Sequence, residues 1–265
     1  MDSVAASSGT RRLPERDLAV LLRSRRWLRR SQPFPHVVAT DVFTPAVYSE
    51  LEADFRTRLV EGAFSNNMPG YDALGVELDA VCDGPFGLFV TRQWHDLIAA
   101  ITGVNATGQI SGGLHHHRIG SANSAVHNDL NPGWFADVER EDGIVVATRN
   151  LCAYSTGEPA QENVCCNEVM RAVAVLFYLG NPPWSPGDGG ETGLYRHRDD
   201  DITAPVAIAP PRSNSLLIFE CTPHSFHGFL TNRFSERNSL IMWLHRRKAD
   251  VIERWGEESI VYWRA

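Results

Sequence analysis

Lysine is almost missing from this chain. Of its 25 basic residues other than histidine, only Lys248 is a lysine. A Walker-A phosphate loop needs a Gly-Lys pair, so that class of nucleotide site is excluded. Schiff-base chemistry needs a lysine amine, and this chain offers only one, so that chemistry is disfavoured as well. Any anion that this protein buries must therefore be held by arginine.

Long apolar runs and basic blocks are also absent. The longest clean apolar stretch, 172–180, is far too short to span a bilayer, and the first ten residues have no apolar core typical of a signal peptide. Acidic residues outnumber basic ones by 32 to 25, which gives a net charge of −7. Phosphate binding lacks its usual electrostatic driving force here. We expect a cytoplasmic protein with neither a membrane nor a nucleic-acid partner.

The cysteines follow no metal-binding or disulfide framework. There are five, an odd number, without CxxC spacing, and Cys165 and Cys166 are adjacent, which is poor geometry for a structural disulfide. We expect reduced thiols.

The first hundred residues have a helical character. Apolar spacing predicts helices over 14–30, from Pro45 to about Val60, and over 86–102. A short strand is expected at 36–43 and a long loop at 61–84, while residues 1–12 have the composition of a disordered segment. Because 14–30 is rich in arginine, a nucleic-acid arm is the alternative to a surface helix there, although the acidic remainder gives it no support.

From about residue 107 the pattern changes to short apolar segments separated by turn residues. Strands without alternating helices indicate an antiparallel sandwich or jelly roll. The segment 156–168 interrupts them and is interpreted as an inserted loop. The predicted strands are 107–120, 123–129, 144–155, 171–180, 191–196, 204–209, 214–220, 225–231 and 237–246.

His127 and Asp129 form a candidate metal-binding pair. On an extended strand, residues two apart project from the same face, so an imidazole and a carboxylate would converge. A third ligand would complete the facial triad of two histidines and one carboxylate that binds Fe(II) with open positions. His197 and Asp199 have the same spacing, but they lie in a charged run typical of a solvated turn, so we favour the first pair.

The third ligand is expected near the end of the chain. His224 and His227 are three apart and cannot both point inward on one strand. Ten residues after His227, Arg237 and Ser239 share one strand face, and the apolar segment that follows indicates a strand entering the core. An arginine there needs a buried anion as its partner; a surface ion pair is the alternative.

The order of these motifs resembles the Fe(II)/2-oxoglutarate-dependent dioxygenases, specifically their prolyl-4-hydroxylase-like branch. The resemblance runs from about 107 to 246, and reaches weakly to the segment PFPHVVATDVF. No single motif is specific, but five occur in the right order. They are His127-Asn128-Asp129, Phe177-Tyr178-Leu179-Gly180-Asn181 with Trp184, Gly189-Gly190-Glu191-Thr192, Phe226-His227-Gly228 and Arg237-Asn238-Ser239. The chain departs from the pattern at Gly180, where asparagine is more usual, and in the 156–168 segment.

The resemblance implies a fold and a set of roles. The fold is a double-stranded β-helix, cupin-like, buttressed by helices: one dioxygenase domain over 13–265, with a helical front (13–105), a jelly-roll core (106–247) and a tail (248–265). His127, Asp129 and His227 would bind Fe(II). Arg237, with Ser239 nearby, would hold the distal carboxylate of 2-oxoglutarate. Tyr178 would either help to bind it or be a plain core tyrosine.

The implied reaction couples O2 and 2-oxoglutarate to C–H oxidation, with release of succinate and CO2 and with ascorbate in support. Related halogenases replace the metal-binding carboxylate with a small residue, so the intact Asp129 favours hydroxylation or a related oxidation.

Substrate identity is weakly encoded. Candidate contacts are Arg118, His116, Asn131 and Trp134. At most two of the three histidines at 115–117 can face inward, and Arg118 fits a substrate carboxylate or an ion pair equally well. We expect a small amino-acid-like metabolite, free or carrier-bound, in a biosynthetic pathway, with 61–84 and 156–168 as possible covers of the site. The alternatives are a protein-residue hydroxylase of prolyl type and a non-oxygenase β-barrel that binds metal or sugar.

Overall fold

A computed structural model describes residues 17–66 and 72–262. Three long strands form the centre of its larger sheet: β4 (Thr107–His117), β7 (Cys166–Tyr178) and β12 (Arg237–Arg247). β12 lies between the other two and is antiparallel to both. The strand order is β1-β2-β10-β7-β12-β4-β3, with β5 paired to β7 and β6 paired to β4. The remaining strands are β1 (Leu28–Arg30), β2 (His36–Thr40), β3 (Leu74–Glu77), β5 (Pro132–Ala136), β6 (Val145–Val146) and β10 (Ser215–Glu220).

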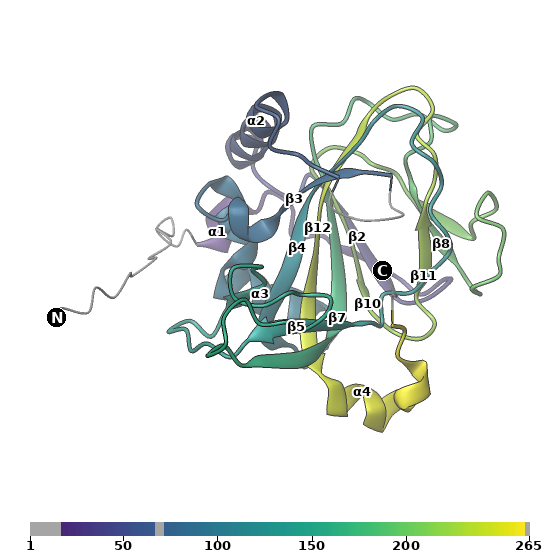
Figure 1. Cartoon of the computed structure of the whole chain (residues 1–265). Coiled ribbons are helices and arrows are strands. Elements are labelled where there is room, and N and C mark those ends of the chain that lie inside the picture. Colours follow the sequence, from purple (N-terminus) through teal and green to yellow (C-terminus); the bar gives the residue numbers. More distant parts are fainter. Residues whose placement is uncertain (1–16, 67–71, 263–265) are drawn as a thin grey trace.

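A smaller sheet, β11-β8-β9, lies on the opposite side of the large sheet from the helices (Figure 1). Its strands are β8 (Thr192–Tyr195), β9 (Ala207–Ala209) and β11 (Phe226–Phe229). Leu194 of the small sheet packs with Leu176, Leu217 and Ile241 of the large one in an inner core. This mainly β, jelly-roll architecture confirms the predicted fold class.

Helices cover the other face of the large sheet (Figure 1). α2 (Pro45–Val60) starts with proline, whose fixed φ suits the first helical turn. The hydroxyl of Thr91 caps α3 (Arg92–Thr102) by accepting from the Trp94 amide at 3.2 Å, and Gly103 ends that helix at a φ of 71°. The short helical elements are α1 (Leu18–Leu21), η1 (Leu78–Ala80), η2 (Pro85–Val90), α4 (Lys248–Trp255) and η3 (Glu257–Ser259).

Alternating residues of β7 and β12 divide the interior in two. Phe177 and Leu240 join the core shared with the helices, whereas Tyr178 and Ile241 face the inner core between the sheets. Because side chains of a strand alternate between its faces, one strand serves both cores. The helix-side core contains residues from Leu18 to Leu244, so helices and large sheet share it.

The helix from Pro45 to Val60 is confirmed, but other predicted elements are corrected. Within the described part of 14–30 the helix is limited to α1, and the segment then extends into the edge strand β1. The predicted helix over 86–102 is divided at Thr91 into η2 and α3. The expected loop at 61–84 contains β3 and η1.

Further corrections concern the second half of the chain. Residues 123–129 form no strand, β5 was not predicted, and β7 begins at Cys166, inside the expected loop. The tail begins with α4. Cys152 and Cys166 form a disulfide, which corrects the expectation of five reduced thiols.

The prediction of disorder at 1–12 falls outside the described residues, and the single-domain division stays a prediction. None of the helices within 17–66 and 72–262 combines the length and apolar character needed to cross a membrane.

Candidate metal centre

The chain brings His127 and His227 together through their own backbones. The His127 amide donates to the His227 carbonyl at 3.0 Å, and the His227 amide donates to the His127 carbonyl at 2.8 Å. This isolated bridge holds the two imidazole centroids 4.4 Å apart. A loop residue is thereby fixed against strand β11 although residues 123–129 form no strand.

Asp129 completes the cluster. Its Oδ2 lies 3.5 Å from Nε2 of His227, and one ligand atom from each of the three residues lies within 4.8 Å of the others. Burial opposes ionisation of this carboxyl, but the adjacent His227 and the Arg171 charge hold its pKa well below the ordinary range. The side chain is therefore a carboxylate at neutral pH.

Both histidines present the tautomer that metal binding requires. Nδ1 of His127 donates to the Ala125 carbonyl at 2.8 Å, and Nδ1 of His227 donates to the Ser225 carbonyl at 3.1 Å. Since a carbonyl only accepts, each Nδ1 carries a proton, and Nε2 is the ring atom left to bind a metal. Burial, with the nearby His227, lowers the pKa of His127 to about 4, so its ring is neutral. Two imidazoles that present Nε2 and one carboxylate fit Fe(II).

Arg237 lies on β12 in the inner core and is 2% exposed. Its Nη1 donates to the Ser239 hydroxyl at 3.0 Å and its Nη2 to the Thr192 hydroxyl at 3.4 Å. Thr192 in turn shares a hydrogen bond of 2.7 Å with the Tyr178 hydroxyl. Arg237, Ser239 and Tyr178, which the sequence analysis named together, are thus connected through Thr192 in one polar site.

No carboxylate pairs with Arg237 among residues 17–66 and 72–262, and its Nε is buried without a hydrogen-bond partner. A buried guanidinium surrounded by neutral groups is costly unless an anion joins it. Its Cζ lies 5.4 Å from the ring centre of Phe229, and Phe229 is two residues from His227 on the same strand face. An anion held by Arg237 would therefore lie on the same inner side as the metal cluster.

His115 and His117 also face this site, which the sequence did not predict individually. In register they lie opposite Ser239 and Arg237, and they are 5% and 0% exposed. Burial, assisted by the Arg237 charge, lowers the pKa of His115 to about 3 and that of His117 to about 2. Both rings are neutral walls of the site.

Arg171 and Trp243 contact Asp129 directly and were missed. Nη1 of Arg171 donates to Oδ1 at 3.1 Å, and the Trp243 indole donates to Oδ2 at 2.8 Å. The guanidinium stacks on the Trp243 ring at 3.7 Å. Both oxygens of the candidate metal-binding carboxylate therefore have a donor from the large sheet.

A β-bulge explains why alternation failed to predict Arg171. Counting back from Tyr178 places Arg171 on the helix-side face. However, the register of β7 against β12 shifts between Leu244 and His245, and Ala172 and Val173 both join the helix-side core. The extra residue turns Arg171 to the inner face, as bulges do beside functional sites.

The structure places the four predicted substrate contacts in different surroundings. His116 points away from Arg237, bonding Asn238 Oδ1 at 2.8 Å and packing on Phe64. Arg118 is exposed. The structure brings neither to the metal cluster.

Asn131 contacts a member of the cluster, whereas Trp134 contacts the inserted segment. The Asn131 backbone amide donates to the Asp129 carbonyl at 2.8 Å, and its buried side-chain Oδ1 has no hydrogen-bond partner among the described residues. Trp134 packs so closely on Gly157 that a Cβ there would lie 2.4 Å from the indole. Trp134 therefore joins the inserted segment to β5.

The competing histidines are exposed. His197 and His224 both lie at the surface, and neither belongs to a metal-binding group among the described residues. Of the two His-x-Asp pairs, the structure places only His127 and Asp129 beside a third ligand.

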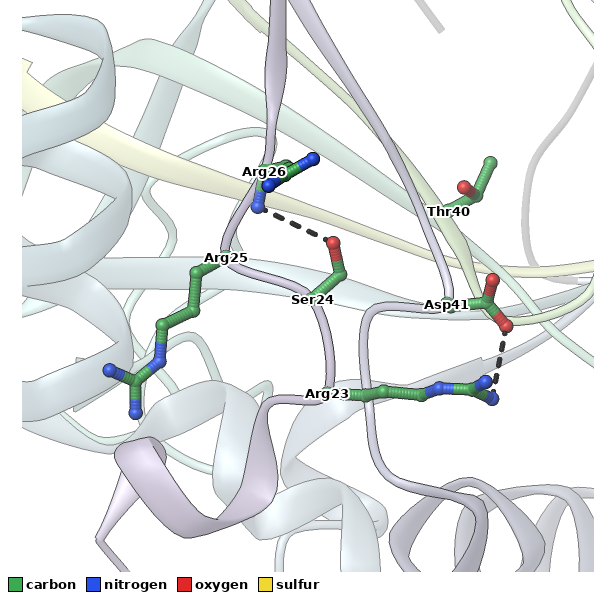
Figure 2. Close-up of a pocket in the computed structure, with 6 residues that line it drawn as sticks. All are labelled: Arg23, Ser24, Arg25, Arg26, Thr40 and Asp41. Atoms are coloured by element: carbon green, nitrogen blue, oxygen red, sulfur yellow. Dashed lines mark hydrogen bonds and ion pairs between the residues drawn. The ribbon is translucent and has the colours of Figure 1, made fainter.

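A separate surface pocket of about 450 Å³ lies between α1, β1 and the end of β2. Figure 2 shows Arg23 extending to Asp41, at 3.4 Å, while Arg25 extends in the opposite direction. The pocket is at the Thr40 end of β2, whereas the His36 end pairs with Phe219, which contacts His227. It contains none of the predicted site residues.

Comparison with known proteins gives three findings. A family model described as the 2OG-Fe(II) oxygenase superfamily matches residues 152–245. This range includes His227 and Arg237 and starts after Asp129. The chain is 43% identical over 58 residues to "Prolyl 3-hydroxylase OGFOD1" of Xenopus laevis, a match that covers 22% of this chain and only 11% of that protein.

Two solved structures share the fold. A prolyl-4-hydroxylase from Pseudomonas putida has a TM-score of 0.53 at 17% identity, covering 80% of this chain and 92% of its own. A prolyl hydroxylase from Trichoplax adhaerens, in complex with a hypoxia inducible factor peptide fragment, has a TM-score of 0.54 at 15% identity, covering 79% and 83%.

Proposed function

The chain belongs to the 2OG-Fe(II) oxygenase superfamily, and on this premise we propose that it is an Fe(II)- and 2-oxoglutarate-dependent dioxygenase that oxidises a C–H bond and releases succinate and CO2. The observation that carries the proposal is the buried Arg237, which has no carboxylate partner among the described residues and faces the same interior as the His127–Asp129–His227 cluster. A barrel without an anionic co-substrate has no reason to bury that cation, so the non-oxygenase alternative is set aside.

Each residue has a role in this proposal. His127, Asp129 and His227 hold Fe(II), which supplies O2 activation when bound. Arg237 and Ser239 hold the distal carboxylate of 2-oxoglutarate, and the buried surroundings strengthen that charge-assisted contact. Tyr178 and Thr192 orient the same polar site through their shared hydrogen bond. The intact Asp129 favours hydroxylation as the outcome.

The test is succinate formation by purified protein supplied with Fe(II), 2-oxoglutarate, O2 and ascorbate. We expect slow uncoupled turnover in the wild type and its loss in His127→Ala and Asp129→Ala, because each variant lacks one of three metal ligands. His197→Ala, which alters the exposed competing pair, is the matched control. Wild-type levels of succinate in Asp129→Ala would contradict the assignment.

The substrate class is a finer proposal. The relatives carry the name prolyl hydroxylase, which favours a polypeptide residue of prolyl type over the small amino-acid-like metabolite that the sequence favoured. We therefore give peptides first place, and keep the free or carrier-bound amino acid of a biosynthetic pathway as the second candidate.

A paired screen separates the two classes. Proline-containing peptides and the corresponding free amino acids are incubated with the enzyme, and a mass gain of one oxygen is measured. Oxidation confined to the free amino acids would reverse the order of the candidates. A cytoplasmic location stays a prediction, checked by fractionation of cells.

A further inference from the structure

Tyr154 lies in the segment between β6 and β7, residues 147–165, which is tied to the large sheet at several points. The Trp134 amide donates to the Tyr154 carbonyl at 2.9 Å, and Cys152 forms its disulfide with Cys166 at the start of β7. A Cβ at residue 133 would lie 2.3 Å from the Tyr154 ring, so only glycine allows the ring to close on β5. The position of the Tyr154 side chain is thus well determined.

The Tyr154 hydroxyl bridges two buried groups. It lies 2.9 Å from Nε2 of His245 and accepts from Nε of Arg171 at 3.1 Å. Nδ1 of His245 contacts the Gln109 carbonyl at 3.0 Å and so carries the proton of that ring. Nε2 is therefore an acceptor, and the hydroxyl must donate to His245 while it accepts from Arg171. Burial lowers the pKa of His245 to about 3, which keeps this pattern at neutral pH.

Arg171 connects the Tyr154 hydroxyl to the candidate metal centre. Its Nε is fixed by Tyr154, its plane by the Trp243 ring, and its Nη1 bonds Oδ1 of Asp129. The other carboxylate oxygen is held by the Trp243 indole. A planar guanidinium with two fixed edges has one orientation, so the Asp129 carboxylate has one as well.

We propose that Tyr154 is a positioning residue for the metal centre: through Arg171 it fixes the carboxylate of Asp129, so that the 147–165 segment contributes to metal affinity. This inference rests on the proposed function, because it takes the His127–Asp129–His227 cluster as the metal site. Outer groups that orient a ligand typically change metal affinity by about 10- to 100-fold when they are altered. Without the hydroxyl, Nε of Arg171 and Nε2 of His245 both lose their partner, and Arg171 can leave Asp129.

Metal binding is measured without turnover, by anaerobic titration with Mn(II) followed by electron paramagnetic resonance of the free ion. We expect Tyr154→Phe, which keeps the ring, to raise the Kd about tenfold. Tyr262→Phe is the matched control, since it removes a surface tyrosine hydroxyl that bonds only Lys248 among the described residues. Its Kd should equal that of the wild type. Circular dichroism of the metal-free proteins checks that both variants fold.

A second variant tests the route through Arg171. Arg171→Lys keeps the charge but not the two-edged geometry, and should also weaken Mn(II) binding; it carries the test alone if Tyr154→Phe does not fold. The double variant Tyr154→Phe/Arg171→Lys should bind Mn(II) no more weakly than Arg171→Lys alone, because both changes break the same connection between Tyr154 and Asp129. Additive losses, or a Tyr154→Phe Kd within twofold of the wild type, would overturn the inference and leave the proposed function standing. A wild type that binds no Mn(II) or Fe(II) would overturn both.

Discussion

Arg237 has no carboxylate partner among the described residues: its terminal nitrogens donate to two hydroxyls, and the rings of Tyr178 and Phe229 lie beside its guanidinium. Hydroxyls orient a guanidinium but do not neutralise it. The site is therefore prepared for an anion that enters from outside the protein and satisfies the remaining N–H of Arg237.

Replacing Arg237 should weaken 2-oxoglutarate binding far more than it affects the metal. We expect Arg237→Gln to raise the Kd for 2-oxoglutarate by at least about thirtyfold, since truncating one partner of a buried charge pair costs about 2–5 kcal/mol. Isothermal titration in the presence of Mn(II) measures this. Arg118→Gln removes an exposed arginine and is the control; equal affinities in the two variants would show that Arg237 is not the anchor.

At the residue scale, the spacing of His127 and Asp129 predicted a candidate metal-binding pair, and the family resemblance added His227 and Arg237. The structure brings His127, Asp129 and His227 into one cluster, although the strand on which the spacing argument relied is not formed at 123–129. His116 and Arg118 were predicted from mere proximity in sequence to the cluster. Strand alternation turned His116 to the other face, and Arg118 lies beyond the end of β4, where it meets solvent.

At the scale of elements, the contact between β4 and β12 depends on a missing side chain. A Cβ at residue 112 would lie 2.4 Å from the Ile241 carbonyl oxygen, which belongs to the backbone of the neighbouring strand. The two strands therefore approach closely only because residue 112 is glycine.

Gly112→Ala should separate these strands locally. We expect a loss of about 1–3 kcal/mol in the free energy of unfolding, the usual effect of overpacking, measured by urea denaturation. Ser111→Ala is the neighbouring control: within 17–66 and 72–262 the buried Ser111 hydroxyl has no hydrogen-bond partner, so its removal should cost little. A Gly112→Ala variant as stable as the wild type would contradict the close approach.

Element boundaries were predictable where local signals were strong. Pro45 marked the start of α2 correctly, whereas the apolar spacing of 14–30 predicted a helix that covers only Leu18–Leu21 in the described part of that segment. There, pairing of β1 with β2 outweighs local preference. The bulge in β7 has no local sequence signal, so the inward turn of Arg171 could not be predicted.

At the scale of the whole molecule, several histidines are buried in the neutral form. The pKa is lowered by burial to about 3 in His115, about 2 in His117 and about 3 in His245, from an ordinary value of 6.5. At any pH between the lowered values and 6.5, these three histidines bind more protons in the unfolded chain than in the folded one. Acid therefore favours unfolding.

The free energy of unfolding should fall as the pH falls below about 6.5. Each of the three imidazoles contributes about 1.4 kcal/mol between pH 7.5 and 5.5, or about 4 kcal/mol together. Denaturation of the metal-free protein at the two pH values measures the change, and the exposed His197→Asn variant should show the same slope. A stability that does not change over this interval would mean that these rings are protonated in the fold.

The alternation of β12 has a consequence for how the protein tolerates change in length. Up to the bulge, its odd-numbered residues build the polar interior and its even-numbered residues build the wall against the helices. Deleting one residue ahead of Arg237 and letting the strand slide to close the gap would exchange the two sets, placing leucines where the co-substrate is proposed to lie and a guanidinium among phenylalanines. Loops that differ in length are compatible with this architecture, but the register of its central strand β12 is fixed.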